Sequence, residues 1–234
     1  MTTYPPDARE LILSRLVSTP DVPILPTAPP SAVTPLPEWD RSTLVDHFVD
    51  ALDRLKVTWE IAESQVLARL TLATRLQDEG VKQILAWTSA ELPVGGVLEA
   101  LDVLGIEAIA PDLFLPDTRL RPQDMDVRRK QLLALERIQV GLISATAAFA
   151  ATGTLLLDSG PGRPLPVSQF PRRLLVLLPI NRILPSLEYW LARAHTVSPL
   201  TTLMTGPSRS ADIEMTPAYG VHGPGRLHVI MVDE

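Results

Sequence analysis

Cysteine is absent from this sequence of 234 residues. A chain without cysteine forms no disulfides, has no thiol nucleophile, and provides no thiolate ligands for zinc or an iron–sulfur cluster. The absence is compatible with a reducing compartment. The opening residues MTTYPPDARE also lack a basic stretch followed by an apolar one, so they indicate no secretory signal. We therefore expect a cytoplasmic protein that holds no metal or iron–sulfur cofactor of its own.

A surplus of basic charge is also lacking, since the formal net charge is −6. Binding to nucleic acid through phosphate neutralisation requires a basic surface, so we expect no nucleic-acid partner. One run without charge, IQVGLISATAAFAATGTLLL at 138–157, is long enough to cross a bilayer. Its glycine, serine and threonine residues favour a buried strand–turn–strand passage instead. We expect no membrane span.

Proline, in contrast, is abundant near the start of the chain, with seven prolines between residues 20 and 37. Proline has no amide donor and a fixed φ, so this stretch can form neither a helix nor a central strand. A short amphipathic helix is predicted before it, over DARELILSRLV. We predict an N-terminal helix and proline-rich arm over 1–39, through which copies of the chain could associate, and an α/β domain over 40–234.

After residue 40 helical and strand patterns alternate. RSTLVDHFVDALDRLK, ESQVLARLTLATRLQDEG, PVGGVLEALDVLG and DVRRKQLLALERI predict helices, and VTWEIA, VKQILAW and IEAIAP predict strands. The second half contains continuous apolar runs, VGLIS, TLLLD, RRLLVLLP, LTTLM and LHVIMV, with a helix predicted over NRILPSLEYWLARAH. Such runs are typical of parallel strands covered on both faces. The order predicts an α/β three-layer sandwich with a mainly parallel sheet.

Two junctions after apolar runs contain residues suited to ligand binding, which in open α/β sheets occurs beyond the carboxyl ends of the strands. The first is Thr152-Gly153-Thr154, with two hydroxyls and a glycine that lets a ligand approach the backbone closely. The alternative is a tight bend whose hydroxyls bond their own backbone. The neighbouring DSGPGRP is interpreted as a hairpin-type turn.

The second junction is TGPSRSADIE at 205–214. Its serines are good helix N-caps, and exposed amides there could hold a phosphate or carboxylate with Arg209 as a fork-shaped donor. A capped helical turn without a ligand explains the stretch equally well. The predicted ligand-binding residues of both junctions are Thr152, Gly153, Thr154, Gly206, Ser208, Arg209 and His222. The predicted turn or cap residues are Pro207, Ser210, Asp212, Glu214 and Gly223.

The histidines indicate no metal site. His222 and His228 are six residues apart across a Gly-Pro-Gly turn, with no third ligand at a recognisable spacing. We expect His228 on one face of the last strand and His222 in a loop. Familiar catalytic motifs, such as a P-loop or a Gly-x-Ser-x-Gly elbow, are absent from the sequence. Catalytic residues therefore stay unassigned.

The second junction continues to residue 232 as TGPSRSADIEMTPAYGVHGPGRLHVIMV. With ATGTLLLDSG at 151–160 and LPINRILPSL at 178–187, it resembles the lactate utilisation protein C family, whose core is the LUD domain. The resemblance implies a fold similar to the NagB/RpiA/CoA-transferase-like superfamily. Many family members carry an acidic residue before the Thr-Gly-Thr turn, where this chain has Ala151.

The resemblance also implies a role in the oxidation of L-lactate to pyruvate, alongside partner subunits that carry iron–sulfur clusters. Two functional hypotheses follow. In the first, the chain is an accessory or ligand-binding subunit of such a system. In the second, it is a stand-alone enzyme or binder for an anionic small molecule of the acyl-CoA, folate or nucleotide type, an expectation by analogy because fold does not fix function. Whether the chain catalyses a reaction stays open.

Overall fold

A six-stranded, entirely parallel sheet forms the centre of the protein in the computed structural model, which describes residues 39–111, 122–193, 198, 200–211, 217–220 and 223–233. Along the sheet the strands follow the order β1-β12-β7-β4-β2-β3. They are β1 (Thr58–Ala62), β2 (Gln83–Ala86), β3 (Glu107–Ile109), β4 (Val140–Ser144), β7 (Arg173–Pro179) and β12 (Arg226–Val232). β4 is buried along its whole length, and β7 and β12 along nearly all of theirs, as continuous apolar runs predict.

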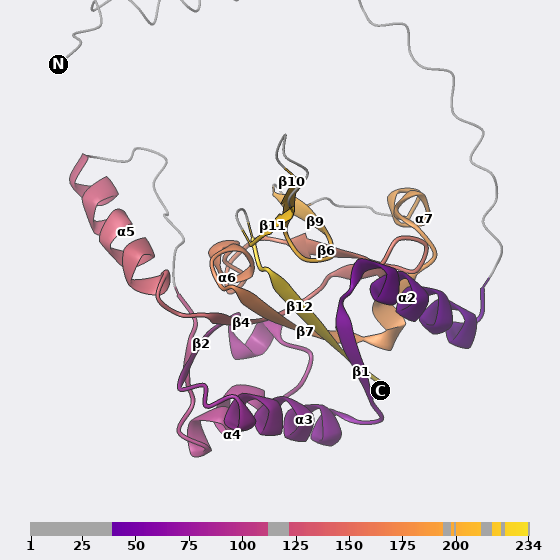
Figure 1. Cartoon of the computed structure of the whole chain (residues 1–234), viewed down its shortest axis with the longest axis horizontal. Helices are drawn as coiled ribbons and strands as arrows, with labels where there is room; N and C mark the ends of the chain where they lie inside the picture. Colours follow the sequence, from indigo (N-terminus) through magenta and orange to yellow (C-terminus); the bar gives the residue numbers. More distant parts are fainter. Residues whose placement is uncertain are drawn as a thin grey trace, which may run out of the picture. The chain divides into compact units, whose positions relative to one another are not determined.

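Helices cover both faces of this sheet. The helices of the described residues are α2 (Arg41–Leu55), α3 (Gln65–Asp78), α4 (Val97–Val103), α5 (Pro122–Leu135), α6 (Pro166–Gln169) and α7 (Leu187–Leu191), with short 3-10 helices η1 (Ser89–Glu91) and η2 (Ile180–Arg182). In Figure 1, α3 and α4 lie on one side of the sheet, and α2 and α6 lie on the other. Helix α2 begins where the sequence predicts, because the Asp40 carboxylate accepts a hydrogen bond from the Thr43 amide at 2.8 Å.

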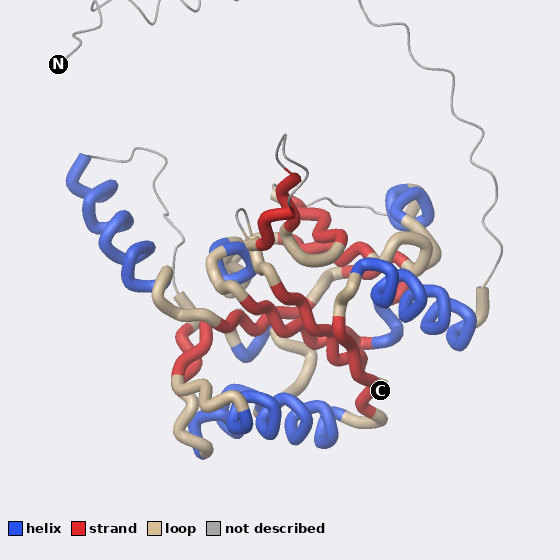
Figure 2. The backbone as a smooth tube through the Cα atoms, in the orientation of Figure 1, coloured by secondary structure: helices blue, strands red, loops and turns tan. Residues whose placement is uncertain are grey.

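A second sheet of four strands packs on the side of α2 and α6 (Figure 2). Its order is β8-β5-β6-β9, formed by β8 (Ile183–Leu184), β5 (Ala147–Phe149), β6 (Thr154–Asp158) and β9 (Thr201–Thr205). β6 is antiparallel to both of its neighbours. The runs TLLLD and LTTLM are therefore strands, as predicted, but their placement in the parallel sheet is wrong. The apolar run of β6 is buried, as predicted, whereas β9 is half-buried or exposed along its length, and neither run carries information on strand direction.

The α/β class and the parallel sheet are confirmed, and two local predictions are wrong. The stretch after Ser208 is β10 (Arg209–Ala211), which pairs antiparallel with β11 (Pro217–Tyr219), and the predicted short helix is absent from this described stretch. Serine also suits turns, so its presence alone does not start a helix. Over the described residues 181–193, NRILPSLEYWLARAH is helical at η2 and α7 alone, because Pro185 and strand β8 interrupt it.

Residues 138–157 form β4, β5 and the start of β6, which confirms the predicted strand–turn–strand passage. Within the described ranges, no helix is long and apolar enough to cross a membrane. The predicted turn in DSGPGRP is confirmed by reciprocal backbone hydrogen bonds between Gly160 and Arg163, of 3.3 and 3.0 Å. The N-terminal helix and arm lie outside the described residues, so the boundary at residue 39 stays a prediction.

Candidate functional site

The order of strands in the parallel sheet reverses between β2 and β4, which are neighbours. From β2 the chain passes through α4 to β3 on one side, whereas from β4 it proceeds to β7 on the other side. Where two connections leave in opposite directions, the loops after the strands diverge and leave a crevice at the carboxyl ends. The sheet topology therefore places the expected ligand crevice just beyond Ala86 and Ser144.

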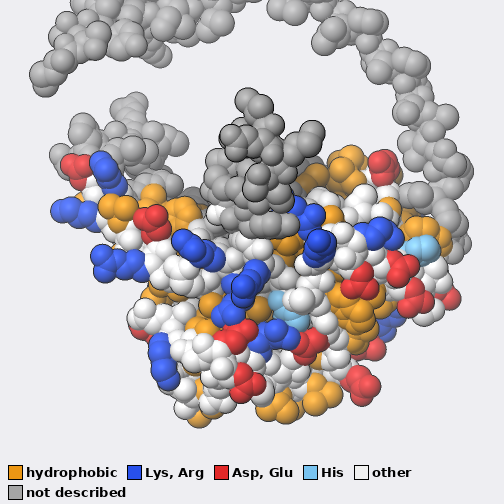
Figure 3. Space-filling view, in the orientation of Figure 1, with side chains coloured by type: hydrophobic (Ala, Val, Ile, Leu, Met, Phe, Trp, Pro, Cys, Tyr) orange, Lys and Arg blue, Asp and Glu red, His pale blue; other side chains and the backbone are white. Residues whose placement is uncertain are grey.

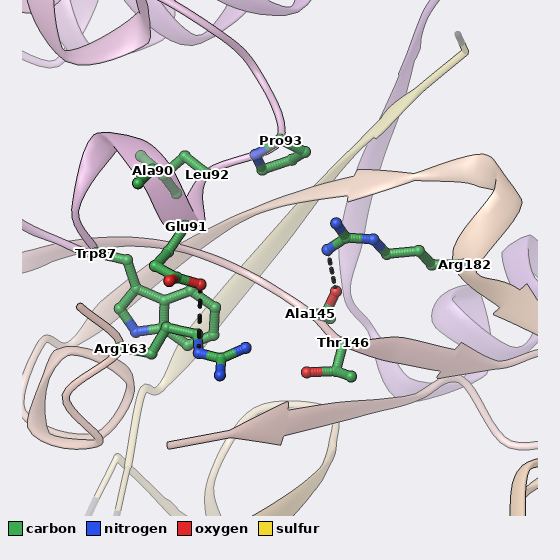
Figure 4. A pocket seen from close by; sticks show the side chains of 9 residues that line it. All are labelled: Trp87, Ala90, Glu91, Leu92, Pro93, Ala145, Thr146, Arg163 and Arg182. Carbon is green, nitrogen blue, oxygen red and sulfur yellow. Dashed lines mark hydrogen bonds and ion pairs between the residues drawn. The ribbon is translucent and has the colours of Figure 1, made fainter. Parts of the chain in front are cut away.

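A cavity of about 320 Å³ occupies this position (Figure 4). We call it the switch-point cavity, because it lies where the strand order reverses. Trp87 directly follows β2, and its amide donates to the main-chain oxygen of Leu142 in β4 at 3.1 Å. Ala145 and Thr146 directly follow β4. The full lining consists of Trp87, Ala90, Glu91, Leu92, Pro93, Ala145, Thr146, Arg163 and Arg182. An indole, two alanines, a leucine and a proline thus meet two guanidinium groups, one carboxylate and one hydroxyl.

Arg182 lies in η2, immediately after β7, and its side chain crosses to the end of β4. Its Nη1 donates to the main-chain oxygen of Ala145 at 2.8 Å and to the hydroxyl of Ser144 at 3.2 Å. The Ser144 hydroxyl in turn donates to the main-chain oxygen of Leu177 at 2.8 Å. These bonds orient the Arg182 guanidinium and leave its other nitrogens available on the cavity side.

Arg163 reaches the cavity from the turn after β6, in the second sheet. Its Nε lies 3.4 Å from Glu91 Oε2, and about a third of each side chain is exposed, 32% and 33%. The turn is docked on the end of β2, because the Thr88 amide donates to the main-chain oxygen of Gly162 at 3.0 Å. Gly162 has a φ of +74°, and a Cβ there would lie 2.5 Å from Thr88 Oγ1. Glycine is therefore required to bring Arg163 this close.

The cavity can hold an anion by its own charges. Two arginines and one glutamate line it, so the lining has a surplus of one positive charge. Over the face seen in Figure 3, basic and acidic side chains are interspersed with apolar surface, so attraction of an anion would depend on the local arginines. Guanidinium groups suit carboxylates because their paired N–H donors match the two carboxylate oxygens. In the part of the chain that the structure describes, no cluster of three carboxylate or imidazole groups could hold a metal ion.

The residues predicted around TGPSRS come together elsewhere. Gly206, Pro207, Ser208, Arg209 and Gly223 line a cavity of about 440 Å³ together with Leu55, Ser168, Gln169, Thr202, Leu203, Met204, Thr205 and Pro224. Several of these residues come shortly before β1, β7 and β12, so this cavity lies at the amino end of the parallel sheet. The prediction assumed that β9 belongs to the parallel sheet and ends at the carboxyl edge of that sheet. Instead, β9 pairs antiparallel with β6 in the second sheet.

Within this second cavity Arg209 and Ser208 bind the protein itself. The Nη2 of Arg209 donates to the main-chain oxygen of Leu55, at the end of α2. The Ser208 amide donates to the main-chain oxygen of Pro224 at 2.8 Å, and the main-chain oxygen of Ser208 accepts from the Gly220 amide at 3.1 Å. Ser210 lies in β10, whereas His222, Asp212 and Glu214 lie outside the described residues. Ligand binding at these positions stays a prediction.

The Thr-Gly-Thr turn is joined to this cavity by hydroxyl groups. Thr154 Oγ1 lies 2.7 Å from Thr152 Oγ1 and 2.8 Å from Thr205 Oγ1, and Thr205 lines the cavity. Gly153 has a φ of +67°, and a Cβ there would lie 2.9 Å from a methyl carbon of Leu55. The close approach that this glycine allows is therefore to helix α2. None of the three turn residues lines the 440 Å³ cavity.

A third cavity, of about 480 Å³, also lies at the amino end of the sheet. It is lined by Gln139, Arg172, Arg173, Gly220, Gly225 and Arg226. Arg173 forms an ion pair with Glu79, while the Arg172 side chain is exposed. Arg172 thus provides an arginine at the sheet end opposite to the switch-point cavity, useful as a matched control.

Sequence reasoning missed the switch-point cavity, although signals for parts of it were present. Trp87 ends the predicted strand VKQILAW, and Thr146 comes two residues after the predicted strand VGLIS. Arg182 lies in LPINRILPSL, one of the stretches that carry the family resemblance. The Gly-Pro-Gly-Arg sequence was interpreted only as a turn. The pairing of β2 with β4 decides the site, and no local pattern reveals it.

Comparison with known proteins identifies the family. Residues 42–232 match the model of the LUD domain. The chain belongs to the LUD-domain family. Its fold is similar to that of a solved structure, a DUF162 family protein from Deinococcus radiodurans, with a TM-score of 0.56 over 83% of this chain and 99% of that one. At 20% identity this likeness concerns the fold alone.

Curated relatives of this LUD-domain chain include proteins named lactate utilization protein C. One from Macrococcus caseolyticus is 27% identical over 171 residues, which cover 70% of this chain and 67% of the relative. Those from Geobacillus sp. and Bacillus subtilis are 31% and 30% identical over 118 residues. In these two, the alignment covers 47% of this chain and about half of the relative, 49%. The resemblance to the lactate utilisation protein C family is thereby confirmed.

Proposed function

We propose that this LUD-domain chain acts in L-lactate oxidation as a ligand-binding subunit that holds a small organic anion in the switch-point cavity. The observation that carries the proposal is the pair of arginines, Arg163 and Arg182, at the carboxyl ends of the parallel strands. The names of the relatives support the pathway. A cavity of about 320 Å³ is near the lower limit of small-molecule sites, which suits a small acid better than a nucleotide or acyl-CoA.

The electron-transfer steps of lactate oxidation belong, in this proposal, to iron–sulfur partner subunits. The sequence offers no cysteine, so it has no thiolate ligands for a cluster. The chain would contribute binding and orientation of an organic anion, with the indole of Trp87 and the apolar side chains of Ala90, Leu92 and Pro93 excluding water from one side.

Growth of the native host tests this role. Deletion of the gene should prevent growth on L-lactate and leave growth on glucose intact. Complementation with the wild-type gene or with Arg172→Gln should restore growth on L-lactate, whereas Arg182→Gln should restore it poorly at equal protein levels. Affinity purification of the tagged chain from the same cells should recover cluster-bearing proteins. Unimpaired growth of the deletion strain on L-lactate would contradict the proposal.

A further inference from the structure

One acidic side chain, Glu91, lines the switch-point cavity among its two arginines. It faces Arg163 at 3.4 Å from Nε. Arg182, in contrast, has only neutral oxygen partners among the described residues, the Ala145 carbonyl and the Ser144 hydroxyl. Glu91 therefore compensates one guanidinium charge and leaves the other uncompensated. The lining has room for one further negative charge before it becomes negative overall.

We propose that Glu91 sets the charge of the ligand, so that the cavity accepts a small monocarboxylate and rejects dianions. This inference rests on the proposed anion site. A single carboxylate on Arg182 balances the cavity, while a second ligand carboxylate would meet Arg163 with Glu91 already beside it. In a partly buried site two carboxylates repel each other strongly, and such repulsion is a common source of specificity.

The rest of the lining fits a ligand with one charged end. Trp87, Leu92 and Pro93 form an apolar wall that a short carbon chain can contact. In Figure 4 the Thr146 hydroxyl is turned toward the Arg163 side of the cavity, where it can bond a hydroxyl or keto oxygen of the ligand. A 2-hydroxy or 2-oxo monocarboxylic acid has these three parts: a carboxylate, a hydroxyl or keto oxygen on the adjacent carbon, and a short carbon chain.

Binding measurements with two three-carbon acids test the role of Glu91. L-lactate has one negative charge and malonate has two at pH 8, so calorimetric titration of both reports charge selectivity at nearly constant size. Wild-type protein should bind L-lactate at least tenfold tighter than malonate. Glu91→Gln keeps the side-chain shape but removes the negative charge, so the surplus positive charge of the lining rises from one to two. It should shift the ratio of affinities toward malonate at least tenfold.

Two further variants separate charge selection from a structural role of the Glu91–Arg163 pair. Arg163→Gln leaves Glu91 in place and should weaken binding of both acids at least tenfold. The double variant Glu91→Gln/Arg163→Gln returns the lining to one surplus positive charge and should recover the preference for L-lactate. If Glu91 acted only through its structural pairing with Arg163, the double variant would bind both acids at least as weakly as either single variant.

The outcomes distinguish this inference from the function on which it rests. An unchanged affinity ratio in Glu91→Gln, or a double variant that binds neither acid, would overturn the role of Glu91 while leaving the anion site intact. Absence of binding of L-lactate, pyruvate and malonate to the wild-type protein would overturn both the inference and the ligand-binding part of the proposed function.

Discussion

The Nη1 of Arg182 lies 2.8 Å from the main-chain oxygen of Ala145, which joins the end of β7 to the end of β4 beside the switch point. An arginine held by backbone before a ligand arrives has little side-chain entropy left to lose when it binds one. The same bond fixes which guanidinium nitrogens face the cavity. The structure thus provides an oriented cation where the sheet topology opens a crevice.

Ser144→Ala tests how far this orientation matters. Ser144 is fully buried, and its hydroxyl bonds both Leu177 and Arg182. We expect unfolding free energy to fall by about 1–2 kcal/mol and L-lactate affinity to fall several-fold. Ser168→Ala removes another buried hydroxyl, which bonds the main-chain oxygen of Leu165 at 2.8 Å, and should reduce stability alone. Equal affinities of the two variants would refute the orienting role of Ser144.

Gly162→Ala should displace the turn that positions Arg163. A Cβ at Gly162 would lie 2.5 Å from Thr88 Oγ1 and 3.0 Å from Glu91 Cγ, at a φ unfavourable for alanine. Titration with L-lactate should show weaker binding. Gly80→Ala is the control, because Gly80 has a similar φ of +65° with nothing within 4 Å of the added Cβ. Both should lose stability, of the order of 1 kcal/mol from the backbone conformation, and only Gly162→Ala should lose affinity.

His228 predicts a specific pH dependence of stability. It is 3% exposed, and its Nδ1 lies 2.8 Å from Thr58 Oγ1. Burial and the charge of Arg75 lower the pKa of His228 from 6.5 to about 4, against the opposing effect of Glu60. Protonation therefore favours the unfolded chain. The contribution of neutral His228 to the free energy of unfolding should be complete above pH 6.5. It should decline as the pH falls toward 4, by at most about 3 kcal/mol.

Urea unfolding of wild-type protein and His228→Gln between pH 7.5 and 4.5 measures this effect. The variant lacks the titrating imidazole, so the difference in unfolding free energy between the two proteins should shrink as the pH falls. A difference that is constant over this range would show that His228 titrates alike in the folded and unfolded chains.

Arg209→Ala decides between the two sites. In the structure Arg209 bonds the main-chain oxygen of Leu55, so its removal should cost about 1 kcal/mol of stability because one exposed hydrogen bond is lost. L-lactate affinity should stay unchanged. Loss of ligand binding in Arg209→Ala would instead support the site predicted from sequence at TGPSRS. A thermal-shift series with CoA, folate and nucleotides on the same variant tests the alternative of a larger anion.

Local patterns predicted the elements of this fold well, because burial and capping are local properties. The runs of β4, β7 and β12 and the start of α2 lie where the sequence places them. Strand direction and sheet membership are set by long-range pairing instead. For that reason β6 and β9 were assigned to the wrong sheet, and the site predicted after β9 lies at the opposite end from the switch point.

The same reason explains why the site was only partly visible in the sequence. Trp87, Thr146, Arg163 and Arg182 are spread over 96 residues of sequence and follow four different elements. None belongs to a recognisable catalytic motif, although Arg182 lies in a stretch that carries the family resemblance, and the adjacency of β2 and β4 brings them together. The chemistry of each residue is evident from its type, whereas their convergence is a property of the fold.

The most direct test of the account is calorimetric titration of L-lactate and pyruvate into wild-type protein, Arg182→Gln and Arg172→Gln. The account predicts equal dissociation constants for wild type and Arg172→Gln. It predicts binding about 10- to 100-fold weaker in Arg182→Gln, from the loss of a charged hydrogen-bond donor in a partly buried cavity. Undiminished affinity in Arg182→Gln, or lost affinity in Arg172→Gln, would contradict the assignment of the switch-point cavity as the anion site.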